Sequence, residues 1–234
     1  MTAPPAHGWF ITGTDTDAGK TVVSAALVLG LKAHYWKPVQ TGSPTDSEYV
    51  AQWTDIGAER IHTEAWRLPL PASPHWAARQ AGRRIALEDL RWPEAPAETV
   101  WIVEGAGGAR APLNERECMT ELMMRLGLPA IVVARQRLGA INHTLLTLEA
   151  LERRGIAIAG VILNHGGSGC VANASGPETS IAADDPLGGN RGAIEETGGV
   201  RVLAELPPIA PLDPPHLQAA YDRYLRAAFS NIQA

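Results

Sequence analysis

The stretch Gly13-Thr-Asp-Thr-Asp-Ala-Gly-Lys-Thr21 decides how this chain is organised. It follows a short apolar run at 9–11 and opens onto an apolar run at 22–29, which is the order strand, glycine-containing loop, helix. Such a loop directs backbone N–H groups at an anion, and the helix N-terminus adds partial positive charge. Lys20 can reach the outer phosphates and the Thr21 hydroxyl can hold Mg²⁺. The stretch therefore predicts a nucleoside triphosphate site.

The spacing of this loop departs from the standard phosphate-loop pattern. Five residues separate Gly13 from Gly19, where the general pattern has four. An isolated Gly-Lys-Thr is common in proteins and would mean little by itself. Here it closes a glycine-led loop between a strand and a helix, so we favour a phosphate-binding loop over an ordinary strand-to-helix turn.

Length and composition indicate one globular domain spanning residues 1–234, with 45% hydrophobic and 19% charged residues. The net charge of −5 argues against non-specific nucleic-acid binding. Cys118 and Cys170 lack metal-ligand spacing and are interpreted as free thiols of a reducing compartment. The start of the chain does not resemble a signal peptide, and no run approaches the length of a membrane span. We therefore expect a soluble, cytoplasmic protein with no membrane partner.

Strand-like and helix-like segments alternate along the chain. The expected strands are 8–13, 34–37, 99–103, 129–134, 156–163 and 200–206. The expected helices are 20–32, 48–56, 75–80, 87–92, 119–126, 139–154, 190–197 and 216–229. Most strands are continuously apolar, which predicts an α/β fold with a mostly parallel sheet covered by helices on both faces, like that of P-loop NTPases. The segment 166–189 is expected to be a long surface loop.

Ligands of such sheets bind beyond the carboxyl ends of the strands. The unusual residues of this chain fall at those ends, namely 13–21, 37–41, 104–108, 135–142, Asn164 and 207–211. Glu104 ends a buried strand, so its carboxylate could reach a Mg²⁺ ion held by Thr21. Lys37 ends the second expected strand, where a further cation beside Lys20 would neutralise charge that builds up during phosphoryl transfer.

Several other polar residues have more than one interpretation. Asp46 or Glu48 could supply another carboxylate to the metal, but helix capping or a solvated first turn would explain them equally well. Asp17, like its neighbour at 15, is more plausibly directed at substrate amines or the metal than at phosphate. His75 and His143 lack metal-ligand spacing, and a structural role is favoured for both.

Taken together, these motifs resemble those of dethiobiotin synthetases. The series consists of Gly13–Thr21, Lys37-Pro-Val-Gln-Thr-Gly42, Ser73-Pro-His75, Glu104-Gly-Ala-Gly-Gly108 and Leu138-Gly-Ala-Ile-Asn-His143. In that family the five-residue gap is the usual form of the loop. The resemblance covers roughly residues 8–165 well and 200–212 loosely.

The resemblance implies an ATP- and Mg²⁺-dependent ligase of biotin synthesis. The family joins CO₂ to 7,8-diaminononanoate and forms the cyclic urea of dethiobiotin. One amine captures CO₂ as a carbamate, which attacks the γ-phosphate of ATP to give a carbamic–phosphoric anhydride. The second amine then closes the ring and expels phosphate. This chemistry requires cations around crowded negative oxygens and two amines held close to the γ-phosphate.

The resemblance also implies roles by position. The catalytic residues would be Lys37, Lys20 and Thr16. Nucleotide contacts would come from Asp17, Ala18, Gly19, Lys20, Thr21, Glu104, Gly105, Ala106 and Gly107, with Asn164, Pro207, Pro208 and Ile209 at the adenine. Substrate contacts would come from Thr16, Lys37, Thr41, Gly107, Leu138, Gly139 and Asn142. The metal ligands would be Thr21, Glu104 and Glu48, with Asp46 as the alternative to Glu48.

Family members are homodimers, so the resemblance implies one here. The helix start at Leu138, Gly139 and Asn142 of one subunit would receive the substrate carboxylate in the site of the other. A partitioning ATPase of similar fold is the main alternative, but such proteins usually carry an extra lysine early in the loop, and residues 11–14 contain none. An amidotransferase of cobalamin synthesis would generally need a glutaminase domain, for which 234 residues leave no room.

Overall fold

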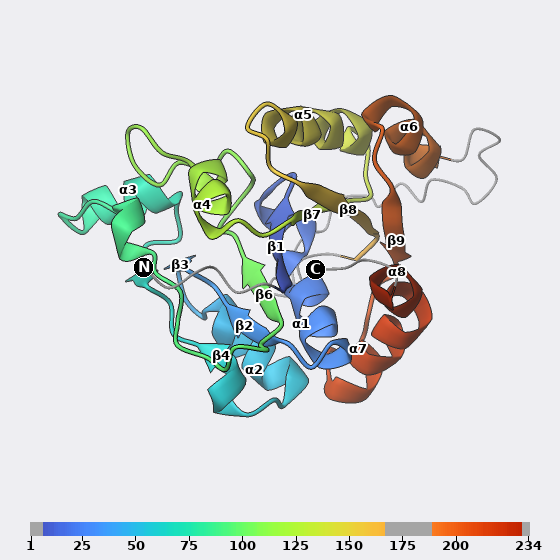
Figure 1. Ribbon diagram of the computed structural model, residues 1–234, viewed down its shortest axis with the longest axis horizontal. Helices are drawn as coiled ribbons and strands as arrows, with labels where there is room; N and C mark the ends of the chain where they lie inside the picture. Colours follow the sequence, from blue (N-terminus) through green and yellow to red (C-terminus); the bar gives the residue numbers. More distant parts are fainter. Residues whose placement is uncertain (1–6, 167–188, 231–234) are drawn as a thin grey trace.

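The computed structural model describes residues 7–166 and 189–230, which are built around a seven-stranded sheet. The strand order is β4-β2-β6-β1-β7-β8-β9, and every neighbouring pair is parallel (Figure 1). The strands are β1 (Gly8–Gly13), β2 (His34–Trp36), β4 (Ile61–His62), β6 (Trp101–Glu104), β7 (Ala130–Arg135), β8 (Ile158–Asn164) and β9 (Val202–Leu206). The expected parallel α/β fold is confirmed. Nearly all of the loop expected at 166–189 lies outside the described residues.

Helices cover both faces of this sheet. Figure 1 shows α4 (Met119–Leu126), α5 (Ala140–Glu152) and α6 (Gly189–Gly198) above it. Below it lie α1 (Lys20–Gly30), α2 (Asp46–Thr54) and α7 (Pro214–Ala220), which is followed by a π-helical turn at 221–225 and by α8 (Arg226–Ser230). A shorter helix, α3 (Pro74–Gln80), packs beside the upper layer.

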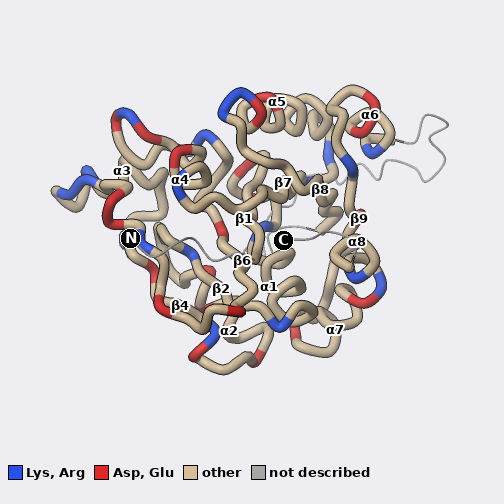
Figure 2. Tube along the Cα trace, in the orientation of Figure 1, with Lys and Arg blue, Asp and Glu red and all other residues tan. Residues whose placement is uncertain are grey.

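The central strand β1 is buried along its whole length because both sheet faces are covered. Alternation along the strand directs Phe10 into the upper apolar layer and Ile11 into the lower one. Full burial of such a side chain contributes about 1.5–3 kcal/mol. Acidic and basic residues are interspersed over the outer helices and loops (Figure 2). Within the described ranges, no helix has the length and apolar character of a membrane span.

One expectation about local structure is wrong, and two segments differ from expectation in detail. The second strand ends at Trp36, next to the expected end at Lys37, because Pro38 cannot donate to the sheet ladder, and β3 (Val39–Thr41) pairs with β5 (Trp66–Leu68) in a separate two-stranded sheet. The helix expected at 87–92 is a single 3₁₀ turn at Leu87–Asp89. The closing helix is interrupted by its π-helical turn. The short strands β4 and β5 follow from pairing that the local sequence does not indicate.

Candidate active site

The loop between β1 and α1 has the geometry of a phosphate-binding loop. Asp15 caps a 3₁₀ turn at Thr16–Ala18, because its Oδ1 accepts a hydrogen bond from the backbone N of Thr16 at 2.7 Å. Gly19 follows at φ 92°, a left-handed conformation that favours glycine, and α1 begins at the next residue. The first turn of an α-helix has N–H groups without intrahelical partners, so the start of α1 can offer them to an anion in the loop.

Lys20 lies at the bottom of this loop, with its side chain only 4% exposed. Its Nζ donates to the carbonyl oxygens of Asp15 and Thr16 at 3.0 and 3.1 Å. Burial and the nearby charge of Lys37 lower the pKa of Lys20 to about 8. A phosphate would supply the negative charge that this buried ammonium lacks.

The carboxylate of Glu104 is the centre of a buried hydrogen-bond network at the end of β6. Its Oε1 accepts from Thr21 Oγ1 and from Lys37 Nζ, each at 3.0 Å. Its Oε2 accepts from the hydroxyl of Tyr35 at 2.9 Å. Donors from the start of α1 and from β2 with the residue that follows it therefore converge on one carboxylate.

Lys37 also forms an ion pair with Asp46, the first residue of α2. Burial alone would lower the pKa of Lys37, but the charges of Glu104 and Asp46 raise it well above its usual value. For Asp46 the signs are reversed. Burial alone would raise the pKa of its carboxyl group, but the charge of Lys37 outweighs that effect and lowers the pKa. Gln40 supports Asp46, since its Oε1 accepts from the Asp46 backbone N at 3.2 Å.

These groups surround a cavity of about 150 Å³ at the carboxyl edge of the sheet. Its lining is Thr16, Asp17, Lys20, Thr21, Lys37, Gln40, Thr41, Asp46, Glu104, Ala106 and Gly107. Most of the residues expected at phosphate, metal and diamine are therefore together. Gly105 lies just behind this wall, where its backbone N donates to the carbonyl of Ile11 at 3.0 Å.

Glu48 is the expected metal ligand that the structure does not bring to this cavity. Its side chain accepts from the backbone N of Thr45 at 2.8 Å in a capping box of α2. Its other oxygen pairs with Arg67 at 2.6 Å on the exposed surface. Between the two acids left open by the sequence, the geometry favours Asp46, because Asp46 lines the cavity.

The residues expected at the adenine lie at the ends of β8 and β9. Asn164 is buried, and its Nδ2 donates to the carbonyl of Ala18 at 3.0 Å, which ties the end of β8 to the phosphate loop. Its Oδ1 accepts from the backbone N of Gly166 at 3.1 Å. A Cβ added to Gly166 would lie 3.3 Å from Cα of Pro208, so the two loops are in close contact. The segment 207–209 is therefore next to Asn164.

The expected carboxylate-binding residues lie at the start of α5 and do not line the 150 Å³ cavity of their own chain. Leu138 is 93% exposed, and Gly139 caps the helix at φ 90°. Asn142 is exposed in the first turn of the helix. A second cavity of about 270 Å³ runs along α5.

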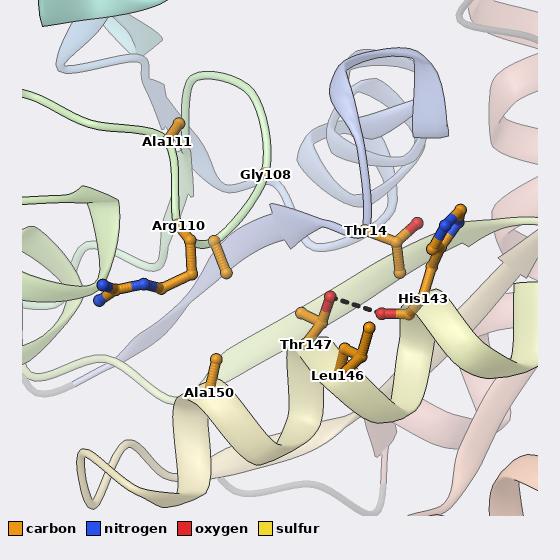
Figure 3. A pocket seen from close by; sticks show the side chains of 9 residues that line it. Thr14, Gly108, Arg110, Ala111, His143, Leu146, Thr147 and Ala150 are labelled. Carbon is orange, nitrogen blue, oxygen red and sulfur yellow. Dashed lines mark hydrogen bonds between the residues drawn. The ribbon is translucent and has the colours of Figure 1, made fainter.

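Figure 3 shows this second cavity, with Thr14 beside His143 at one end and Ala150 at the other. His143 thus lines a cavity, and its carbonyl accepts from Thr147 Oγ1 at 2.8 Å. Arg110 points away from α5 in this view. His75 is partly exposed, and its Nδ1 lies 3.2 Å from Ser73 Oγ.

Sequence reasoning missed three polar residues near the site. Tyr35 lies in β2 two residues before Lys37, which directly follows the strand, so strand alternation could have placed both side chains on one face. Gln40 gives no such signal. Arg137, in the loop before α5, pairs with Asp15 of the phosphate loop at 2.9 Å, and only the tertiary structure brings the two together.

The fold and this loop define a P-loop NTPase-like protein, and a solved structure agrees. The chain resembles a ParA family ATPase from Chlorobium tepidum with a TM-score of 0.50 and 11% identity, over 94% of this chain and 92% of that one. At that identity the likeness concerns the fold alone.

Sequence comparisons give the family. A family model described as an AAA domain matches residues 7–216. An ATP-dependent dethiobiotin synthetase of Paramagnetospirillum magneticum is 49% identical over 87% of this chain and 89% of its own length. The enzyme of the same name from Afipia carboxidovorans is 41% identical over 90% of this chain and 92% of its own length. The chain belongs to the dethiobiotin synthetase family.

Proposed function

We propose that this protein closes the cyclic urea of dethiobiotin from CO₂ and 7,8-diaminononanoate at the expense of ATP. Membership of the dethiobiotin synthetase family supports the overall reaction. The route would pass through a carbamate on one amine and a carbamic–phosphoric anhydride, which the second amine attacks with loss of phosphate. Residues 1–234 would act as a single enzymatic domain.

The observation that carries the proposal is the second buried cation at the phosphate loop. Lys37 is 4% exposed and lies with Lys20 in the wall of one small cavity. A nucleotide-binding loop needs one lysine, whereas joining a carbamate to a γ-phosphate brings two sets of negative oxygens together. A fixed ammonium group stabilises such developing charge without reorganising at the moment of reaction. Lys37 and Lys20 would be catalytic in this sense.

Contacts with both substrates follow from the wall of the cavity. Residues Thr16 to Thr21 would hold the phosphates, and Thr16 would also stabilise the reacting groups. Thr41 and Gly107 line the same cavity and would contact the diamine. Residues 104–107 would line both phosphate and diamine. Asn164 and the loop 207–209 would contact the adenine, since Asn164 donates to Ala18 of the phosphate loop and Gly166 lies close to both Asn164 and Pro208.

The oxygen donors at this cavity fit Mg²⁺, which prefers oxygen ligands. Thr21 Oγ1 and a carboxylate oxygen of Glu104 lie 3.0 Å apart, and Asp46 lines the same wall. We propose Thr21, Glu104 and Asp46 as the residues that hold the ion, in preference to Glu48. Within the described residues no group of three His, Cys, Asp or Glu could hold a metal by itself. The phosphates of ATP and water would complete the shell, and the ion would neutralise phosphate charge when bound.

We also propose a homodimer in which each α5 start completes the site of the other subunit. None of Leu138, Gly139 and Asn142 lines the cavity of its own chain, and Leu138 and Asn142 are exposed, which supports a role in trans. The backbone N–H groups of the first turn of α5 would receive the substrate carboxylate.

One assay tests the reaction directly. The purified protein is incubated with ATP, Mg²⁺, bicarbonate and 7,8-diaminononanoate, and both phosphate and dethiobiotin are measured. Equal amounts of the two products are expected, and omission of the diamine should abolish phosphate release. Steady ATP turnover without the diamine, and with no cyclic urea formed, would contradict the proposal.

A further inference from the structure

The hydroxyl of Tyr35 lies against the Glu104 carboxylate in a position to which the reaction above gives no task. Tyr35 is the middle residue of β2, and its side chain is fully buried. It donates to Oε2 of Glu104 at 2.9 Å, whereas Thr21 and Lys37 both donate to Oε1 at 3.0 Å. The two carboxylate oxygens are therefore divided between different partners.

Separate donors on the two oxygens affect the orientation of the carboxylate, because the terminal torsion of a glutamate side chain is soft. The last torsion of a glutamate side chain is broad and does not fix the plane of the carboxylate by itself. Donors to Oε1 constrain only one of the two oxygens, whereas a further donor to Oε2 also holds the second oxygen and so restricts the torsion about the Cγ–Cδ bond. In the register of the sheet, Tyr35 pairs with Ile102, two residues before Glu104. Its phenol therefore reaches Glu104 from the neighbouring strand.

The hydroxyl of Tyr35 is buried among apolar side chains. Tyr35 belongs to the apolar layer beneath the sheet, together with Ile102, Val50 and Trp53. A hydroxyl placed among such groups is costly unless it forms a hydrogen bond, and the acceptor here is the carboxylate of Glu104. A phenylalanine would fill the same space without that requirement, so the hydroxyl is not explained by packing.

We propose that Tyr35 is a positioning residue that fixes the Glu104 carboxylate so that Oε1 faces Thr21, Lys37 and the bound metal. Partners that orient a metal-binding side chain change the affinity of the site although they never contact the ion. The inference rests on the proposed function in one respect, namely that Glu104 acts at Mg²⁺.

The test is the isosteric variant Tyr35→Phe, studied by calorimetric binding of ATP with and without Mg²⁺ and no diamine. We expect the gain in ATP affinity that Mg²⁺ confers to fall about tenfold or more, with affinity in the absence of metal unchanged. The Mg²⁺ concentration for half-maximal activity should rise by a similar factor. Tyr221→Phe is the matched control, because Tyr221 is also buried in the lower apolar layer but lies in the π-helical turn near the C-terminal end.

Two results would overturn the inference. One is a Tyr35→Phe protein whose ATP binding depends on Mg²⁺ as in the unmodified protein. The other is an equal loss of ATP affinity with and without metal, which would indicate a distorted loop. In a Glu104→Ala background the Tyr35→Phe change should have no further effect, and an additive loss would also contradict a role through Glu104. Because the binding experiment contains no diamine, failure of the unmodified protein to form dethiobiotin would overturn the proposed function and leave this result standing.

Discussion

At the scale of single residues, the site depends on one buried carboxylate and the cations around it. Glu104 is fully buried and accepts hydrogen bonds from Thr21, Lys37 and Tyr35. Removing one partner of a buried charged pair typically costs about 3–5 kcal/mol, because the other charge stays buried and unpaired. That cost is below the stability of most folded domains, about 5–15 kcal/mol. Substitutions here should therefore change activity before they abolish folding.

The variant Lys37→Ala tests the catalytic assignment. We expect dethiobiotin formation to fall by about 10²- to 10³-fold, the usual effect of removing one group that stabilises transition-state charge. Circular dichroism should show a folded protein. The control is Lys32→Ala, since Lys32 is exposed just beyond α1. Near-normal product formation by Lys37→Ala would show that the assignment is wrong.

A pair of substitutions in α2 tests whether Asp46 or Glu48 is the metal ligand. Asp46→Asn should raise the Mg²⁺ concentration needed for half-maximal activity, because Asp46 lines the cavity. Glu48→Gln should leave that concentration unchanged and lower the free energy of unfolding only slightly, because glutamine can still serve the capping box while the exposed ion pair with Arg67 is lost. Activity is titrated with Mg²⁺ and unfolding with urea. The opposite pattern would assign the metal to Glu48.

At the scale of elements, the short edge strand β4 is held by contacts that depend on pH. His34 Nδ1 and His62 Nε2 lie 2.8 Å apart between β2 and β4, and both rings pack near Trp101. Burial and the nearby His34 lower the pKa of His62 to about 4, and burial and Arg60 lower that of His34. One ring must donate and the other accept, so the contact requires that they are not both protonated.

This pair predicts a loss of stability in mild acid. The unfolded chain binds a proton at each histidine near pH 6.5, whereas folded His62 does so only near 4. The free energy of unfolding is therefore highest above pH 6.5 and should fall as the pH is lowered toward 4. Urea unfolding at pH 7 and pH 5 measures this difference. The variant His62→Phe keeps a ring beside Trp101 and should show a smaller difference, and an unchanged difference would exclude His62 as its source.

At the scale of the whole molecule, the site lies where five strand ends meet the start of α1. The phosphate loop follows β1, Lys37 follows β2, Glu104 ends β6, Arg137 follows β7 and Asn164 ends β8. In a parallel sheet these ends lie along one edge, which is why segments far apart in sequence share one cavity. The exposed start of α5 lies at this edge too, but its residues do not line the cavity of their own chain.

Mixing two inactive variants tests the proposed dimer. Lys37→Ala removes the cation proposed to be catalytic, and Asn142→Asp places a negative charge where the partner's substrate carboxylate would bind. In a mixed dimer one site carries both changes and the other carries neither, so co-expression should restore activity to that second site. Light scattering should give twice the mass of one chain. A monomer, or mixed protein as inactive as its parents, would contradict the shared site.

The sequence by itself determined the fold class and the identity of most groups at the cavity. Local patterns sufficed, because the loop 13–21 is contiguous and buried parallel strands are apolar throughout. Strand ends could be predicted to form the site, since topology places them at one edge. The resemblance to a known family could also be found from the sequence, because each of its motifs is a contiguous stretch. That resemblance in turn explains the extra residue in the phosphate loop.

Only the tertiary structure decided which polar groups touch. It directed Asp46 rather than Glu48 into the cavity, because the capping box and Arg67 occupy the Glu48 side chain. It paired β3 with β5 outside the main sheet and brought Tyr35 to Glu104 across neighbouring strands. These contacts join residues distant in sequence and depend on strand order and register, which local propensity does not specify. The phosphate loop is contiguous in the sequence, but Lys37, Asp46 and Glu104 come to line one cavity with it only through the fold.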